Sequence, residues 1–405
     1  MTLTSLISNL TDRCAKSDYK KSVLAIVDTT AISCFGHANR LQSKNGLGPL
    51  SERFTLGYCL QPILCLDAAD KMPLGISSVH IWNRSNDLLI DHHKRYISER
   101  ESNKWYTPVK EARDTVLNQA DPITFIMDRE GDIYEVMEGL PDRHTDIVIR
   151  AHHDRYIIHR NSRIKTSQYV DGLPICGQLT IPLPSRKRSR ERIVANIRFG
   201  TVIIPKAKHA LYLSHTRDEV AMSIIEVKEV SNKKDKVHWR LWTSKPITTL
   251  KDAKEIIDIY KSRWHVEEMF RLMKTEAFDI ESSELEKPEN LFKLGVLVME
   301  ASLLIKQLKA VREEESKIRV DSIFTTDEIE CLVALDADLK GTTIKQSNPF
   351  NNESLSWASR IIARIGGWKG YASQRQPGSI TYKRGLERFY DVYEGFQIAK
   401  LMYKR

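Results

Sequence analysis

Long hydrophobic runs are absent from this chain of 405 residues. No apolar segment approaches the roughly 20 residues that a membrane-spanning helix needs. The N-terminal stretch MTLTSLISNLTDRCAKSDYKK also lacks the apolar core of a signal peptide. These absences predict a cytoplasmic protein that has no membrane partner.

Paired cysteines are absent as well. The chain has six cysteines and no CxxC pair, which argues against structural zinc and against a disulfide scaffold. Internal repeats and low-complexity tracts are not found either. What is present is an ordinary globular composition, 41% hydrophobic and 28% charged, and enough length for two or three domains.

The charge balance is basic. Lysine and arginine number 62 against 53 acidic residues, a net charge of +9 that makes nucleic acid a plausible partner without demonstrating it. The densest basic run is SRKRSRER, residues 185–192, between two strand-like segments. Two interpretations of this run stay open, a solvated loop and a loop that contacts phosphates.

Two aspartates end apolar segments that are predicted to be buried strands. Asp28 follows SVLAIV, and Asp128 follows PITFIM. Reactive groups commonly collect at strand ends in α/β sheets. Each aspartate alone is a weak signal, because aspartate also forms turns; together with a third carboxylate they would indicate a site.

The third carboxylate lies on a helix predicted over about residues 251–276. Tyr260, Arg263, Glu267 and Lys274 fall within an arc of about 60° when each residue turns by about 100°. A charged stripe is usually a solvated face. Here the flanking positions are apolar, so the stripe borders the buried edge of the helix: Ile259, Val266, Phe270, Met273. Trp264, on the other flank, either stacks a base or belongs to the core.

Three carboxylates, Asp28, Asp128 and Glu267, can hold two divalent cations about 3.5–4 Å apart. One ion lowers the pKa of an attacking water or 3′-hydroxyl, and the other stabilises the leaving oxygen. Hard oxygen ligands favour Mg²⁺ or Mn²⁺. This combination predicts phosphodiester chemistry on nucleic acid.

These motifs carry a family resemblance. Asp28 in VDTT, Asp128 in MDREGDIYE and the pattern Y-x2-R-x3-E-x6-K resemble the DDE transposases of bacterial cut-and-paste elements. More narrowly, they resemble the insertion-sequence-four family with its YREK signature. The tail GGWKGYASQRQPGSITYKRGLERFYDVYEG is similar to the C-terminal region of that family, so the resemblance covers about residues 20–400.

The resemblance implies an α/β fold with an RNase H-like mixed-sheet catalytic core, an inserted all-β subdomain and a helical C-terminal region. Residues 21–144 and 246–311 are expected to form the core, and 145–245 the β insertion. Residues 312–405 are expected to form the helical region and to serve dimerisation, after a lead-in over 1–20.

The resemblance also assigns roles to single residues. Asp28, Asp128 and Glu267 become the catalytic residues and the ligands of the two metal ions.

Five further residues are expected to contact DNA. Tyr260, Arg263 and Lys274 match positions that grip the terminal phosphates of a transposon end, and Trp239 matches an aromatic that helps hold a flipped base. For Trp239, a place in the core stays an alternative. Arg129 contacts phosphate or pairs with a neighbouring carboxylate.

The implied activity is cut-and-paste transposition by a nucleoid-associated homodimer in a synaptic complex with double-stranded DNA. One strand is nicked at the transposon end, the freed 3′-hydroxyl forms a hairpin, and the end is then joined to target DNA. A general RNase H-like nuclease and a regulatory DNA-binding form remain alternatives.

At the N-terminus this sequence differs from the family pattern. The family carries a helical end-binding domain before the first aspartate strand, and Asp28 leaves little room for one. Two interpretations stay open: the chain is an N-terminally truncated form, or end recognition lies elsewhere in it. A truncated form that pairs with full-length protein would act as an inhibitor of transposition.

Overall fold

The computed structural model describes residues 1–16, 22–34, 39–41, 44–50, 55–83, 101–182, 192–206, 217–231, 236–340, 347–371 and 374–403. The basic run at 185–192 lies outside the described residues, apart from its last residue. The helices are α1 (Leu3–Ala15), α2 (Thr107–Asp114), α3 (Tyr134–Gly139), α4 (Thr166–Asp171), α5 (Leu250–Lys261), α6 (Trp264–Arg271), α7 (Pro288–Ala310), α8 (Thr326–Leu339), α9 (Leu355–Ile365) and α10 (Ser379–Tyr403). The strands are β1 (Val23–Val27), β2 (Thr30–Ser33), β3 (Gly48–Pro49), β4 (Leu56–Asp67), β5 (Pro73–Trp82), β6 (Ile123–Met127), β7 (Thr145–Arg150), β8 (Tyr156–His159), β9 (Ser162–Lys165), β10 (Gly177–Pro182), β11 (Arg192–Pro205), β12 (Glu219–Glu229) and β13 (His238–Thr243).

The centre of the fold is a mixed sheet in the order β5-β4-β1-β6-β7. Strands β5, β4 and β1 are antiparallel neighbours, and β1, β6 and β7 are parallel. All five residues of β1 and of β6 are buried, because helices cover both faces of the sheet. The expected α/β fold with an RNase H-like mixed sheet is therefore confirmed.

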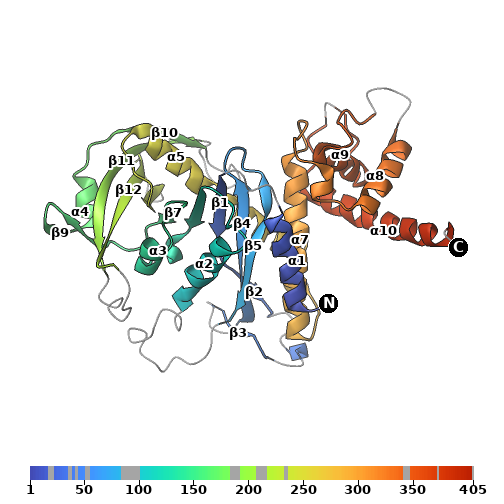
Figure 1. Cartoon of the computed structure of the whole chain (residues 1–405), viewed down its shortest axis with the longest axis horizontal. Helices are drawn as coiled ribbons and strands as arrows, with labels where there is room; N and C mark the ends of the chain where they lie inside the picture. The colour runs from blue at the N-terminus through green and yellow to red at the C-terminus, as the bar shows by residue number, and fades with distance from the viewer. Residues whose placement is uncertain are drawn as a thin grey trace.

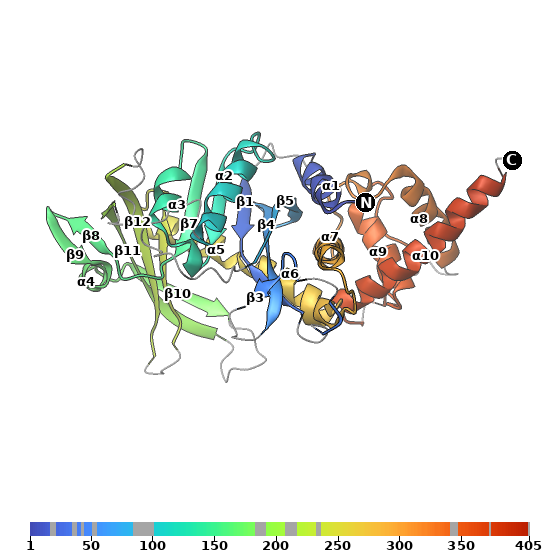
Figure 2. The same cartoon turned by 90° about the horizontal axis from the view of Figure 1, so that it is seen from below.

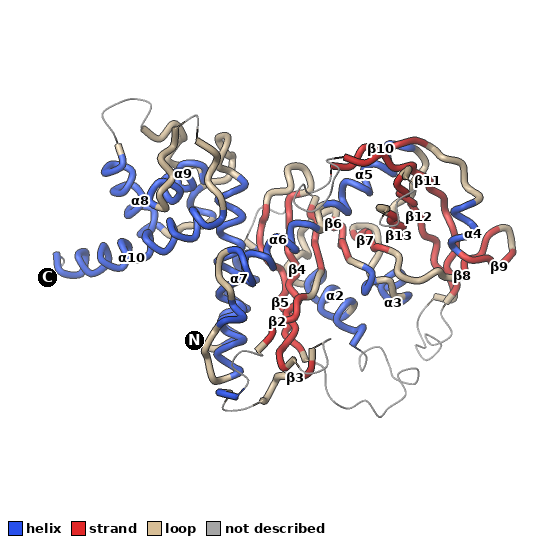
Figure 3. Tube along the Cα trace, turned by 180° about the vertical axis from the view of Figure 1, so that it is seen from behind, coloured by secondary structure: helices blue, strands red, loops and turns tan. Residues whose placement is uncertain are grey.

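Alternate residues of β1 point into different cores, as the two-residue period of a strand requires. Leu24 and Ile26 pack in the core beneath α1, α5, α6 and α7, whereas Ala25 and Val27 pack in the core beneath α2 and α3. Figure 1 shows α2 and α3 together on one side of the sheet, and Figure 3 shows α5 and α6 from the other side. Asp28, the residue after β1, emerges between these two layers.

The β insertion continues the central sheet instead of forming a second one. Strand β7 pairs with β6 in parallel and with β13 antiparallel, after which the order runs β12-β11-β8-β9. Residues 145–150, which the sequence groups with the insertion, are thus the fifth strand of the central sheet. The segment also contains a helix, α4, so it is not purely β.

A buried carboxylate joins three strands of the insertion. Glu226 on β12 is 1% exposed and accepts hydrogen bonds from Arg198 (3.0 Å), His238 (2.8 Å) and Arg240 (3.2 Å). Burial raises the pKa of Glu226, but the hydrogen bonds from His238 and Arg240 outweigh burial and lower it to about 2. The ion cluster is therefore held together by one negative charge at its centre.

We expect Glu226→Gln to lower the free energy of unfolding by about 2–4 kcal/mol, because it leaves the two clustered guanidinium groups of Arg198 and Arg240 without their counter-charge. The folded pKa of Glu226, about 2, lies below that of a free glutamate. The ionised carboxylate therefore contributes its full share to the free energy of unfolding above about pH 4.5, and this contribution disappears as the pH falls towards 2. Urea unfolding between pH 3 and pH 7 measures both effects. Glu219→Gln, on the exposed end of the same strand, is the control; equal losses in both variants would contradict the prediction.

The C-terminal region is a separate helical core built on the second half of α7. Ile305 and Leu308 of α7 pack with side chains of α8, α9 and α10, among them Leu332, Trp357 and Phe389. Figure 2 shows α7 nearly end-on between the sheet and this region. One helix thus contributes to both cores. None of the helices in the described part of the chain combines the length and apolar composition needed to cross a bilayer.

Candidate active site

The two strand-end aspartates lie side by side. Strands β1 and β6 are parallel neighbours, and their last residues, Val27 and Met127, are in register. Asp28 and Asp128 come next in each strand, so they occupy equivalent positions at the same edge of the sheet. The Asp128 carboxylate also accepts the backbone N–H of Glu130 at 2.9 Å, which turns the chain directly after the strand.

The helix expected over residues 251–276 is interrupted twice. Helix α5 begins at a capping box formed by Thr249 and Asp252, and ends at Lys261. Ser262 and Arg263 link it to α6. Residues 272–276 then form a π-helical turn. The single continuous helix expected over residues 251–276 is therefore wrong: the segment consists of α5, α6 and a π-helical turn.

Arg263 joins the helix to the strand ends. Its guanidinium donates from Nη1 to Asp28 Oδ2 at 2.7 Å and from Nη2 to Glu267 Oε1 in a short contact. The three side chains are only 13–33% exposed. Glu267, one turn along α6, is thereby tied to the same strand edge as the two aspartates. The three carboxylates expected to act together are brought to one place.

The crowding of acids shows in their pKa values. Burial raises the pKa of Asp28 to about 7; Asp128 and Glu267 add to this effect, and Arg263 opposes it. Burial also raises the pKa of Asp128, against the hydrogen bond from Glu130. A carboxylate that is destabilised by burial and by its neighbours is a typical mark of a functional site, and a bound cation would relieve it.

Tyr260 and Trp239 lie together beside this cluster. Their ring centroids are 5.7 Å apart in an edge-to-face arrangement. Tyr260 is 5% exposed, and its hydroxyl makes no hydrogen bond with a described residue. Burial raises the pKa of Tyr260, while the guanidinium groups of Arg263 and Arg150 oppose the shift. A buried phenol beside two cations can donate a hydrogen bond to an anionic oxygen that binds there.

Arg150 is the site residue that the sequence analysis missed. It ends β7, whose residue Ile149 is in register with Met127, so it lies next to Asp128 at the same strand edge. Burial lowers the pKa of Arg150, Tyr260 raises it, and Arg129 and Arg263 lower it further. The signal was available: DIVIR is a third apolar strand ending in a charged residue.

Lys274 is placed differently from its three partners in the stripe. It lies in the π-helical turn, and its Nζ is 3.6 Å from Glu281 Oε1. Glu281 in turn accepts the backbone N–H of Ser33 at 2.9 Å. Lys274 thus connects the end of α6 to β2, at the margin of the site.

Two flanking residues are accessible. Arg129, directly after Asp128, is exposed, and no described carboxylate forms an ion pair with it. Trp264 is 50% exposed, so it is not a core aromatic. Of the two interpretations of Trp264 left open by the sequence, an accessible stacking surface remains.

The donor set fits divalent metal ions in its chemistry but not in its present arrangement. Carboxylate oxygens suit Mg²⁺ and Mn²⁺, and the adjacent aspartates can share an ion. Within the described residues, however, no group of three or more His, Cys, Asp or Glu side chains is arranged as a metal site. Arg263 explains the difference, because it holds one oxygen each of Asp28 and Glu267.

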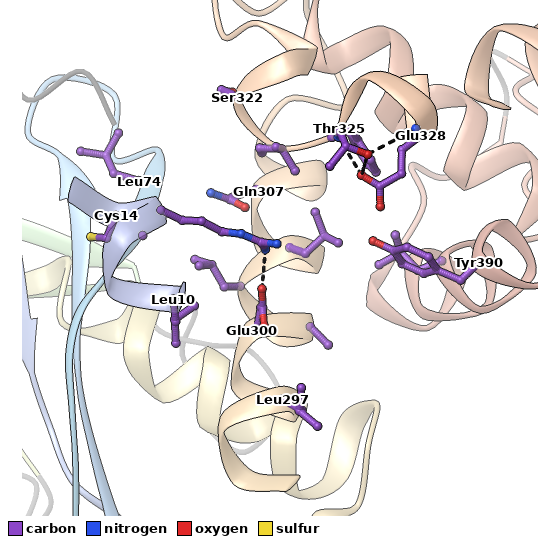
Figure 4. Close-up of a pocket in the computed structure, with 18 of the residues that line it drawn as sticks. Leu10, Cys14, Leu74, Leu297, Glu300, Gln307, Ser322, Thr325, Glu328 and Tyr390 are labelled. Atoms are coloured by element: carbon purple, nitrogen blue, oxygen red, sulfur yellow. Dashed lines mark hydrogen bonds and ion pairs between the residues drawn. The ribbon is translucent and has the colours of Figure 1, made fainter. Parts of the chain in front are cut away.

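A cavity of about 630 Å³ lies away from these residues, between α1, α7 and the C-terminal helices. Figure 4 shows Leu10 and Cys14 on one wall and Tyr390 on the other, with Glu300 on α7 between them. Glu300 forms an ion pair with Arg13 across the cavity. None of the carboxylates of the candidate site lines it, so size does not identify the reactive site here.

Residues 106–304 match the family model described as "Transposase DDE domain". The matched region contains Asp128, Glu267 and the DNA-contact candidates, and it begins after Asp28. The match supports a transposase of the DDE class.

A solved structure with a similar chain is "Cryo-EM structure of piggyBac transposase synaptic complex with hairpin DNA (SNHP)". The sequences are 7% identical, the TM-score is 0.37, and the likeness covers 70% of this chain and 46% of the other. This chain therefore spans less than half the length of that one, and a likeness at this level identifies neither substrate nor partner.

Proposed function

We propose that this chain, with its transposase DDE domain, cuts and joins DNA at transposon ends as an enzyme of the insertion-sequence-four type. The observation that carries the proposal is the meeting of Asp28, Asp128 and Glu267 at one strand edge, through register in the sheet and through Arg263. Two acids from adjacent parallel strands and one from a helix suit phosphodiester chemistry, in which positioning and charge provide most of the catalysis.

The three carboxylates would hold two Mg²⁺ or Mn²⁺ ions, which supply Lewis acidity at the attacking and leaving oxygens when they are bound. Asp28 and Asp128 come from the rigid centre of the sheet, so their separation is set by strand pairing. Glu267 comes from α6 and can approach once Arg263 releases it. The protein contributes no covalent nucleophile in this scheme.

The cationic side of the site would bind the DNA end. Arg150, Arg263 and the unpartnered hydroxyl of Tyr260 converge next to the carboxylates, where a phosphate oxygen could accept from all three. Lys274 and Arg129, at the two margins, would contact neighbouring phosphates. A phosphate bound here would also draw Arg263 away from Asp28 and Glu267.

The aromatic side would hold an unpaired base. Trp239 packs edge-on to Tyr260, which fixes its ring at the border of the site. We assign Trp239 to a base flipped out during hairpin formation, since stacking on an aromatic offsets part of the cost of unstacking.

The proposal includes the full reaction on double-stranded DNA: nicking, hairpin formation and strand transfer. It also includes a synaptic homodimer that uses residues 312–405 for dimerisation.

A strand-transfer assay tests the proposed function. A labelled duplex taken from the DNA that flanks the coding region, with a free 3′-hydroxyl, is mixed with supercoiled plasmid and Mg²⁺ or Mn²⁺. We expect the label to become joined to the plasmid, because the carboxylates and phosphate-binding residues act on a strand end. Plasmid nicking without joining would instead identify a general nuclease. Binding without either product, with both metals, would identify a regulatory form.

A further inference from the structure

An exposed hairpin at the edge of the sheet gathers cations away from the carboxylate site. Strands β8 and β9 form this hairpin, residues 156–165, which we call the basic hairpin. It is the last pair in the strand order. Figures 1 and 2 place it at the far end of the molecule from α10.

The two faces of the basic hairpin differ. Ile157 and Ile164 are opposite each other and pack into the core beneath α2 and α3. The other face carries Tyr156 opposite Lys165, and Ile158 opposite Arg163. Strand alternation therefore directs the aromatic ring and both cations to the outer face.

The cations are arranged around the tyrosine. Tyr156 is 49% exposed. Lys165 Nζ is 4.0 Å and the Arg163 guanidinium carbon 5.3 Å from its ring centroid. No described carboxylate forms an ion pair with either cation. Lys165 Nζ donates to the backbone carbonyl of Asp154 at 3.0 Å, while both carboxylate oxygens of Asp154 accept from Ser167.

The tip of the hairpin adds a third cation in an unusual backbone conformation. Arg160 and Asn161 have φ angles of 48° and 62°, the left-handed region that two-residue hairpin turns require. Asparagine is common there, but arginine is disfavoured. The tight turn presents Arg160 to solvent, and a strained residue of this kind is a reason to suspect a function.

We propose that the basic hairpin binds the phosphate backbone of duplex DNA, as a contact separate from the carboxylate site. Three cations that form no ion pair with a described carboxylate suit phosphates. The Tyr156 ring contacts two of these cations and therefore helps to position them. A two-stranded ribbon is also narrow enough for the major groove. The inference rests on the proposed function only in taking DNA as the partner.

The test is DNA binding as a function of salt, without divalent ions. Fluorescence anisotropy with a 40-base-pair duplex of arbitrary sequence compares the wild-type chain with Arg160→Ala/Arg163→Ala/Lys165→Ala between 50 and 200 mM NaCl. Each lost phosphate contact removes about 0.9 from the slope of log K against log salt. We expect a slope shallower by about two to three and binding about tenfold weaker at 0.1 M salt. Tyr156→Phe should bind like wild type, and Tyr156→Ala should lose part of the affinity.

The matched control removes the same charge from exposed sites in the C-terminal region, as Lys317→Ala/Lys340→Ala/Arg384→Ala. If the two triple variants bind alike, the proposal is wrong while the proposed function stands. Single-stranded DNA that competes as well as duplex overturns the duplex assignment. A wild-type chain that binds no duplex would remove both the proposal and the function.

Discussion

Asp128→Asn is expected to abolish metal-dependent DNA cleavage and joining while leaving the fold at least as stable as in the wild type. Activity should fall by on the order of a thousandfold or more, because the amide cannot supply a ligand charge. The amide oxygen can still accept the Glu130 N–H that the carboxylate accepts now. Burial raises the pKa of Asp128 in the folded chain, so its charge is destabilised there and neutralising it removes that cost.

The measurement pairs product formation on labelled duplex with thermal unfolding of the same preparations, at pH 8 with Mn²⁺. Asp28→Asn and Glu267→Gln should behave alike in activity. Asp338→Asn, on the exposed face of α8, is the control for an aspartate without such a role. Cleavage retained by any of the three site variants would remove that residue from the metal-binding set. Lost activity with strongly lowered stability would show that the residue supports the fold instead.

Arg263→Ala is expected to change metal binding and DNA binding in opposite directions. In the free protein the guanidinium occupies oxygens of Asp28 and Glu267, as a cation would. Its removal should let Mn²⁺ bind about tenfold more tightly without DNA, equivalent to about 1.4 kcal/mol. Binding of DNA with a free end should weaken, since we propose that Arg263 also contacts the terminal phosphates.

Electron paramagnetic resonance of free Mn²⁺ measures the first effect, and anisotropy on end duplex the second. The pH must be 8 or above, because Arg263 restrains the pKa of Asp28, which is about 7 in its presence and rises further without it. Arg263→Lys should be intermediate, as an ammonium cannot bridge two carboxylates in the fork geometry of a guanidinium. Glu255→Gln, exposed on α5, is a control. Weaker Mn²⁺ binding in Arg263→Ala at pH 8 would show that the guanidinium assists metal binding and does not compete with it.

The helix expected over residues 251–276 illustrates which features a local sequence pattern does not determine. The spacing of Tyr260, Arg263 and Glu267 indicated a reactive stripe beside an apolar edge, and the structure puts all three at the site. Lys274 does not lie on the same face as these three residues, because residues 272–276 form a π-helical turn. Such a turn contains one residue more than a turn of α-helix. Neither interruption contains the glycine or proline that usually marks a helix break in a sequence.

Arg150 is a residue that strand pairing places at the candidate site although the local sequence pattern did not predict it there. Its strand was recognised, yet it was grouped with the β insertion, so its end was not considered together with those of β1 and β6. Only the pairing of β7 with β6 places Arg150 beside Asp128. Neighbourhood in a sheet is decided by hydrogen bonds between strands distant in sequence, and no single strand's pattern encodes its partner.

The sequence by itself determined which segments are buried strands, that Asp28 and Asp128 end two of them, and that Glu267 lies on the edge of an amphipathic helix. Those features follow from hydrophobic periodicity, which is a local property of the chain. Only the tertiary structure decided that the three carboxylates meet, that Arg263 pairs with Asp28 and Glu267, and that Arg150 lies beside Asp128. These features depend on strand register and on which side chains share a buried space, and both are set by contacts between residues far apart in the chain.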